Sequence, residues 1–299
     1  MTDWLNAITG TPEGARLATI LAIAAAFLHA VFGALQKGRF DPWLSRAAID
    51  SAYGLIALPI ALFLVPWPEP VHWLILLGAV VIHIIYKTLQ AMTYQRGAYT
   101  VVYPVVRGSA PLFAVIFAGV VFGEHFNAVQ WLGVAILVLA IFGLAGFNYR
   151  RITVGRDTLL PALGFAMLTG ASVALYTTYD AYGVRATPNP FTFLAWFFFL
   201  DSLYMPILQW RRLVSVPTDL RGPLARRAVI GALVAFASFG SILMATRLDD
   251  VGRAAVLRET STVFAALVGW LMLGERVGPV RVVLMALIAL GAVIVEFAA

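Results

Sequence analysis

The sequence predicts an all-α integral membrane protein, with ten transmembrane helices arranged as two inverted five-helix repeats around a central cavity. Of the 299 residues, 61% are hydrophobic and only 12% are charged, whereas soluble domains have about 25% charged residues. Ten apolar runs are each long enough to cross the hydrocarbon of a bilayer as a helix. The third observation is that part of the first half of the chain recurs in the second half.

Proline, glycine and charged residues separate the apolar runs and mark the expected ends of the helices. No stretch between them is long enough to form a soluble domain. Residues 1–150 hold the first five runs and 151–299 the second five, so we expect two repeats with these bounds. The expected spans are 17–36, 47–65, 71–94, 98–122, 127–147, 158–182, 190–210, 227–248, 253–273 and 277–297.

The internal repeat is clearest where VVRGSAPLFAVIFAGVVFGEH (105–125) aligns with VLRETSTVFAALVGWLMLGER (256–276). At a constant offset of 151 residues, Arg107 matches Arg258, and a Gly-Glu pair follows each arginine in the same register. Chance similarity between two apolar helices would not readily align such rare intramembrane residues. Because each half holds an odd number of spans, the second half enters the membrane from the opposite side, as in inverted-repeat transporters.

Several classes of activity lack the residues that they need. Cysteine is absent, and the four histidines do not have the spacing of a metal site. No phosphate-binding GxxxxGK[ST] loop occurs, so we do not expect ATP hydrolysis. The serines lack a GxSxG context, and there is no HExxH. We therefore expect no cofactor, no metal and no enzymatic activity, and keep an intramembrane enzyme or a channel as the alternative to a secondary transporter.

The basic residues predict the orientation. The formal net charge is +6, and most of the 21 Lys and Arg residues lie in the short connections that follow odd-numbered spans. Retention of such residues in the cytoplasm explains them better than a nucleic-acid partner does. The positive-inside rule then places both termini on the outer side of the membrane. The opposite face, termini included, holds only Arg16, Arg185, Arg247 and Arg253.

Polar side chains within the spans indicate a cavity, because a polar group in hydrocarbon usually faces the bundle interior or water. In span 71–94, His83, Tyr86 and Lys87 recur on one helix face, and Tyr176 and Asp180 do the same in span 158–182. Hydrogen bonding between helices is the alternative explanation. The expected substrate-binding residues are His83, Tyr86, Lys87, Tyr103, Arg107, Tyr176, Tyr179, Ser238 and Arg258, with Asp50, Tyr53, Asp201 and Tyr204 as weaker candidates.

The matching arginines leave two interpretations open. A guanidinium in a dry bundle needs an acceptor, such as a backbone carbonyl, the carboxylate of Glu259 or a carboxylate of the substrate. Arg107 and Arg258 either act at two gates and clamp an acidic group, or lock helices through a structural ion pair. Glu124 and Glu275 are expected to organise helix ends and turns rather than to bind substrate.

Ten spans, two five-helix halves and the Gly-Glu pair at the end of the fourth span of each half resemble the EamA-type drug/metabolite transporter superfamily. The resemblance covers nearly the whole chain and extends to the YddG-like aromatic amino-acid exporters. It implies a multi-pass exporter in a bacterial inner membrane that moves amino acids or other small metabolites by alternating access. Proton or counter-substrate coupling would drive it, while the oligomeric state stays unknown. Many relatives keep their termini in the cytoplasm, and the charge pattern of this sequence departs from that.

Overall fold

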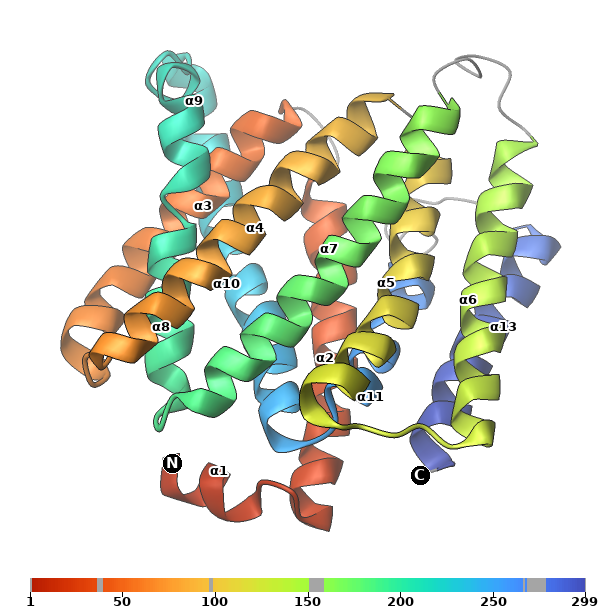
Figure 1. Ribbon diagram of the computed structural model, residues 1–299. Helices are drawn as coiled ribbons and strands as arrows, with labels where there is room; N and C mark the ends of the chain where they lie inside the picture. Colours follow the sequence, from red (N-terminus) through yellow and green to blue (C-terminus); the bar gives the residue numbers. More distant parts are fainter. Residues whose placement is uncertain are drawn as a thin grey trace.

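The computed structural model describes residues 2–36, 40–96, 99–150, 159–265, 267 and 278–298, and these residues are almost entirely helical (Figure 1). The helices are α1 (Thr2–Ile8), α2 (Pro12–Gln36), α3 (Pro42–Pro59), the π-helix η1 (Ile60–Leu64), α4 (Pro70–Arg96), α5 (Tyr99–Phe122), α6 (Ala128–Tyr149), α7 (Leu159–Ala186), α8 (Pro190–Asp201), α9 (Tyr204–Val214), α10 (Thr218–Leu248), α11 (Val251–Arg258) and α13 (Pro279–Phe297).

Within the described ranges, eight helical segments are long and apolar enough to cross a membrane, and the bent pair α8 and α9 makes nine. These segments agree with the expected spans to within a few residues, apart from the longer start of α10. The expected ninth span, 253–273, lies only partly in the described residues. There α11 ends at Arg258, a turn covers Glu259 and Thr260, and helix resumes at Ser261. The described part of the chain therefore shows eight or nine spans, and the count of ten stays a prediction.

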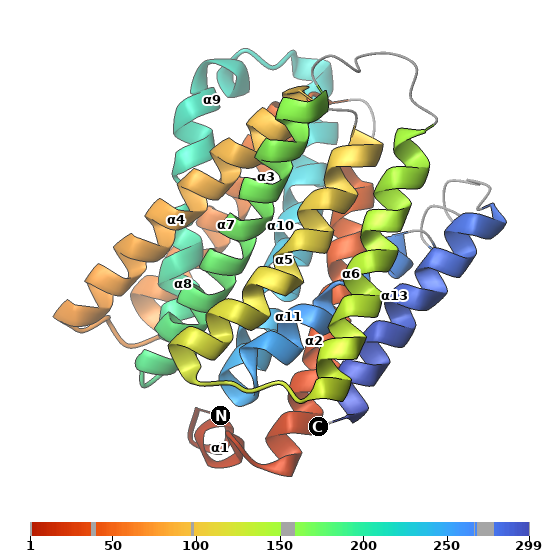
Figure 2. The same ribbon diagram turned by 45° about the vertical axis from the view of Figure 1, so that its right-hand side comes forward.

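The two halves run in opposite directions, and the first long helix of each half packs on a helix of the other half. Helix α2 leaves the face that carries both termini, whereas its counterpart α7 runs back toward that face (Figure 1). Helix α2 packs on α10 of the second half, and in the same way α7 packs on α4 of the first half. The counterparts α6 and α13 lie side by side at one end of the bundle (Figure 2), while α5 packs on α11 and α3 on α8 and α9.

Local sequence explains where several of these helices begin and bend. The Asp41 carboxylate accepts hydrogen bonds from the first backbone N–H groups of α3, and Asn127 forms a capping box with Gln130 at the start of α6. The span made of α8 and α9 bends by 42°. Pro206 follows this bend, and because it has no N–H it cannot continue the hydrogen bonding to the carbonyl of Ser202.

Small residues bring helix backbones together in the bundle, as is common in membrane proteins. A Cβ atom added at Gly133 of α6 would lie 2.8 Å from the carbonyl oxygen of Gly291 in α13. Buried alanines of α5, α7 and α11 meet in the same manner (Ala114, Ala118, Ala174, Ala181 and Ala255). Large apolar side chains on the outside of the bundle, such as Leu55, Phe63 and Leu139, are exposed where lipid would surround them.

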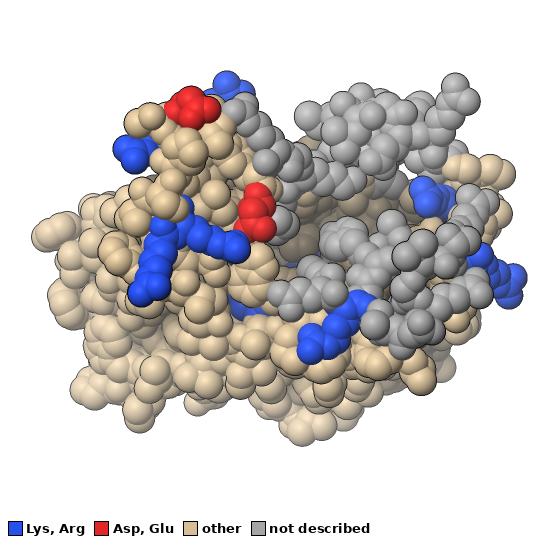
Figure 3. Space-filling model, turned by 90° about the horizontal axis from the view of Figure 1, so that it is seen from above, with Lys and Arg blue, Asp and Glu red and all other residues tan. Residues whose placement is uncertain are grey.

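The face opposite the termini differs from the face that carries them. Seen from that side, Lys and Arg side chains gather at the surface, and a hollow lies near its centre beside residues that are not described (Figure 3). This is the face that holds the connections after odd-numbered spans, so its basic character agrees with the charge pattern of the sequence.

Candidate functional site

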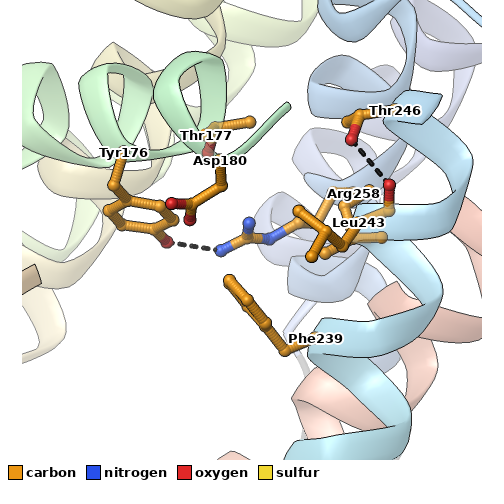
Figure 4. Close-up of a pocket in the computed structure, with 8 residues that line it drawn as sticks. Tyr176, Thr177, Asp180, Phe239, Leu243, Thr246 and Arg258 are labelled. Carbon is orange, nitrogen blue, oxygen red and sulfur yellow. Dashed lines mark hydrogen bonds between the residues drawn. The ribbon is translucent and has the colours of Figure 1, made fainter. Parts of the chain in front are cut away.

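A pocket in the bundle interior lies between α7, α10 and α11 (Figure 4). Arg258, the last residue of α11, extends its side chain into the pocket, where its guanidinium meets the Tyr176 hydroxyl of α7. Asp180, one turn further along α7, lies beside Tyr176 and also lines the pocket. Phe239 of α10 lies on the other side of the guanidinium from α7. The residues that line this pocket are Tyr176, Thr177, Asp180, Phe239, Ile242, Leu243, Thr246 and Arg258.

Arg258 carries a buried positive charge with few partners. Its Nη2 donates a hydrogen bond of 2.8 Å to the Tyr176 hydroxyl, and the residue as a whole is only 8% exposed. In the described ranges, no Asp or Glu oxygen lies within 4.0 Å of a nitrogen of this guanidinium. Because a guanidinium has five N–H donors, Arg258 keeps donors for a further acceptor.

Asp180 is the buried carboxylate of the pocket. Its Oδ2 lies 2.8 Å from Nε2 of His83 on α4, whereas its Oδ1 is buried and has no hydrogen-bond partner among the described residues. A buried carboxylate oxygen without a donor is costly, so this atom is suited to accept a hydrogen bond from a bound molecule. The pocket thus presents one cation and one anion, each with unused bonding capacity.

Aromatic rings form the wall beside this pair of charges. The His83 ring centroid lies 4.4 Å from that of Tyr176 and 5.8 Å from that of Phe239. The Tyr86 ring centroid lies 4.9 Å from that of Tyr176. Flat aromatic faces bind apolar and aromatic groups without a demand for hydrogen bonds. Of the residues expected from the sequence, the structure brings together His83, Tyr86, Tyr176 and Arg258.

Arg107 lies next to this pocket but has its own partners. Its Nε is 3.0 Å from Oε2 of Glu259, and its Nη2 donates to Ser261 Oγ at 2.9 Å and to the carbonyl oxygen of Arg258 at 3.5 Å. Tyr103 lies one turn before Arg107 on α5 and is half-buried. The ion pair between α5 and the segment after α11 holds the two counterpart helices together at their crossing.

Lys87, one turn beyond His83 on α4, belongs to a separate buried cluster. Its Nζ lies 2.9 Å from Oδ2 of Asp201 and 3.3 Å from Oδ2 of Asp50. Arg46 Nε binds the other oxygen of Asp50 at 2.6 Å, and the Tyr53 hydroxyl donates to Asp201 at 2.7 Å. Two basic and two acidic side chains balance in charge there and tie α3 and α4 to the C-terminal end of α8.

Two other expected residues contact neighbouring helices instead of the pocket. Ser238 Oγ donates to the carbonyl oxygen of Ala25 at 2.9 Å and thereby joins α10 to α2. Tyr179 packs its hydroxyl end against Gly78 of α4. The pocket is lined instead by Asp180 and Phe239. Asp180 is a polar residue of α7 that the sequence pattern marks, whereas Phe239 lies in the apolar helix α10, where nothing in the sequence distinguishes it from its neighbours.

On the face with the termini, Glu124 follows the end of α5 and contacts the start of α11. Its Oε1 accepts a hydrogen bond from the backbone N–H of Val251 at 2.7 Å, and its Oε2 accepts one from Gly252 at 2.9 Å. Burial raises the pKa of Glu124, and these two backbone bonds oppose that shift. The expectation that Glu124 organises a helix end is met, although the helix belongs to the other half. Glu275 lies outside the described residues.

Comparison with known proteins agrees with this architecture. The model of the EamA-like transporter family matches the chain twice, at residues 16–146 and 160–297. A crystal structure described only as that of a protein superposes with a TM-score of 0.75 at 16% identity, covering 94% of this chain and 99% of that chain, which shows a shared fold. No curated protein matches the sequence. Because the family model covers most of both halves, the chain belongs to the EamA-like transporter family, whose members are membrane transporters of the drug/metabolite type rather than enzymes.

Proposed function

We propose that this chain is a secondary transporter that exports small zwitterionic metabolites, foremost amino acids with aromatic or apolar side chains, by alternating access through the central pocket. One observation carries the proposal: Arg258 and Asp180 line the same pocket, the Oδ1 of Asp180 has no partner among the described residues, and the Arg258 guanidinium donates there only to Tyr176. An amino acid has a carboxylate and an ammonium group on one carbon, and such a pair of charges complements this pair of side chains.

Each part of the pocket has a separate role in this proposal. Arg258 binds the carboxylate, because a guanidinium offers paired N–H donors in the geometry of a carboxylate. Asp180 Oδ1 accepts from the ammonium group, so that both buried charges are neutralised together. The rings of His83, Tyr86 and Tyr176 contact the side chain of the substrate and favour an apolar or aromatic one.

The packing of the two halves supports a change in access. The pocket has room for about one water molecule in this conformation, so a substrate requires its lining helices to separate. The contacts of the first half with the second are matched by equivalent contacts of the second half with the first, such as α2 on α10 and α7 on α4. The bundle could therefore open in two equivalent ways, one toward each face of the membrane. The hollow on the basic face (Figure 3) and the alanine contacts on the terminus face favour access from the basic face here.

The orientation in the cell follows from the difference in basic residues between the two faces. The positive-inside rule assigns the basic face to the cytoplasm, both termini to the periplasm, and the hollow to the side from which an exporter loads. A bacterial inner membrane and ten spans complete this proposal. His83 and Asp180 are our candidates for proton coupling, because a proton on this pair competes with the ammonium group of a substrate for the same carboxylate.

Counterflow in proteoliposomes tests the function. Vesicles preloaded with an unlabelled amino acid take up the labelled one transiently above equilibrium if the protein is a carrier, whereas a channel gives no overshoot. A screen of aromatic, apolar and charged amino acids then ranks the substrates. Loss of a charged hydrogen bond in Arg258→Gln lowers uptake of the best substrate by about 10- to 100-fold. The matched control is Arg212→Gln, because Arg212 forms an exposed ion pair with Asp41. Equal uptake by both variants would overturn the role of Arg258.

A further inference from the structure

The contact between Glu124 and α11 crosses the boundary between the two halves of the chain. Glu124 belongs to the connection between α5 and α6 in the first half, and α11 belongs to the second half. Both carboxylate oxygens accept from successive N–H groups at the start of α11, where the helix dipole also favours a negative charge. The N-cap residue itself, Asp250, makes no side-chain hydrogen bond to these groups. A side chain from the opposite half therefore caps α11.

Helix α11 connects this contact to the pocket. It has only eight residues, Val251–Arg258, which corresponds to a length of about 12 Å. Glu124 holds its first turn, and its last residue is Arg258, which enters the pocket. Because so short a helix moves as a rigid unit, a displacement at Val251 is transmitted to Arg258.

The region between the capping contact and the pocket is closed by small side chains, with Phe113, Phe117 and Phe122 packed against them. Val251 packs with Ala118 of α5 and Ala181 of α7, and all three side chains are fully buried. One layer deeper, Ala255 packs with alanines of α5 and α7 directly beside the pocket. Apolar contacts of such small residues are easily separated and re-formed. The hydrogen bonds of Glu124 are directional contacts that hold the first turn of α11, whereas Arg107 holds the end of this helix against α5.

We propose that Glu124 is a latch that keeps the pocket closed toward the face that carries both termini and, through α11, positions Arg258. The inference rests on the proposed alternating access, in which this face must open for release. Charged neighbours surround the latch: Arg185 of α7 has its Nη2 4.0 Å from Oε1 of Glu124, and Asp250 precedes α11. Arg185 also donates to the carbonyl oxygens of Thr246 and Asp249 and thus holds α10 at the same point.

The absence of cysteine makes the test direct, because an introduced cysteine is the only thiol in the chain. Thr177→Cys is the reporter, since Thr177 lines the pocket and also the space beside the alanine layer. A membrane-impermeant thiol reagent is applied to sealed vesicles from the terminus face. We expect slow labelling with the native latch and labelling about 10-fold faster in Glu124→Ala, which loses two charge-assisted hydrogen bonds.

A second variant removes the donor instead of the acceptor. Val251→Pro eliminates one N–H that binds Glu124, and proline is well tolerated at the first position of a helix. Asp250 already has the extended conformation that a residue before proline prefers, with φ −56° and ψ 131°. We expect faster labelling in this variant too. The matched control is Glu69→Ala, which removes an exposed carboxylate before α4 on the same face.

The outcomes separate the latch from the transport function. Labelling that accelerates in Glu124→Ala and Val251→Pro, but not in Glu69→Ala, supports the latch. Unchanged labelling of the two latch variants, in protein that stays monodisperse, overturns it. Counterflow by the native chain is measured in parallel without any thiol reagent, so failure of transport would disprove the proposed function and leave the labelling result interpretable.

Discussion

Arg107 and Arg258 occupy matching positions in the two halves and lie side by side where α5 crosses α11, but among the described residues only Arg107 has a carboxylate partner. Its Nε is 3.0 Å from Glu259, whereas no Asp or Glu oxygen of the described residues lies within 4.0 Å of Arg258. We infer from this difference that the two interpretations that the sequence leaves open for these arginines apply to one residue each. Arg107 holds the crossing together, and Arg258 has a guanidinium available for a ligand.

This division predicts different consequences for the two arginines. Arg107→Gln leaves the Glu259 carboxylate buried without its cation, which costs about 3–5 kcal/mol. We expect a clearly lower melting temperature in detergent, and partial recovery in the double variant Arg107→Gln, Glu259→Gln. Arg258→Gln should lower transport with a much smaller change in melting temperature. Equal thermal losses for the two single variants would contradict the division.

Asp180→Asn tests whether this carboxylate binds an ammonium group. The amide has no negative charge, so the variant loses the attraction for an amino acid but not for the corresponding acid without the amino group. We expect inhibition of counterflow by phenylalanine to weaken by about 10-fold relative to inhibition by phenylpropionate. Competition curves for both compounds, measured in the native chain and the variant, give this ratio. An unchanged ratio would show that Asp180 does not select the amino group.

Lys87→Met tests a structural role for the cluster on α3, α4 and α8. The substitution removes the cation that both Asp50 and Asp201 contact, which costs about 3–5 kcal/mol in a buried network. We expect less folded protein and a lower melting temperature, with recovery when Asp201→Asn is added. Arg96→Met, at an exposed basic residue of the same helix, is the control. A fully stable Lys87→Met protein that fails only in substrate binding would favour the role expected from the sequence.

The spans could be predicted from the sequence because the thickness of the hydrocarbon sets the length of each apolar run. Span 71–94 corresponds to α4 at Pro70–Arg96, for example. Pro206 marks the run 190–210 as a candidate for a kink, but a break of the helix before this proline and the short helix α1 were not predicted. The break does not interrupt the apolar pattern of that run, and α1 is too short to be a span.

The site was predictable in its residue types but not in its partners. Helical spacing puts His83 and Lys87 on one face of α4, yet His83 faces α7 and Lys87 faces α3 and α8. One helix face is wide enough to contact two different neighbours, and only the packing of the bundle decides which neighbour each side chain meets. For the same reason the sequence did not reveal that Glu124 caps a helix of the other half.

The pKa of Glu124 predicts how the latch responds to pH. Burial and the negative charge of Asp250 raise this pKa, while the two backbone bonds and Arg185 lower it, with a net rise. In an open form the carboxyl is solvated and has its ordinary pKa, so the closed form binds a proton more tightly. Falling pH at this face therefore favours the closed form, and rising pH through the raised pKa weakens it.

Labelling of Thr177→Cys should accordingly be slower at about pH 5 than at about pH 8, once the reactivity of the thiol itself is corrected with an exposed cysteine. Glu124→Gln cannot titrate, so the pH dependence should disappear in that variant. A pH dependence that persists in Glu124→Gln would assign the effect to another group, and the nearest candidate is Asp250, whose pKa is also raised by burial.

A close approach of two helix backbones predicts a stability effect away from the pocket. Gly133 of α6 and Gly291 of α13 face each other, and a Cβ at Gly291 would lie 2.6 Å from the carbonyl oxygen of Gly133. Gly291→Ala must therefore push the two helices apart, at a cost of about 1–3 kcal/mol. Gly146→Ala in α6 is the matched control, because a Cβ there meets nothing within 4 Å. We expect the melting temperature to fall in Gly291→Ala and to stay unchanged or rise in Gly146→Ala, since alanine favours helix over glycine. Equal melting temperatures for the two variants would show that α6 and α13 are not held at this distance.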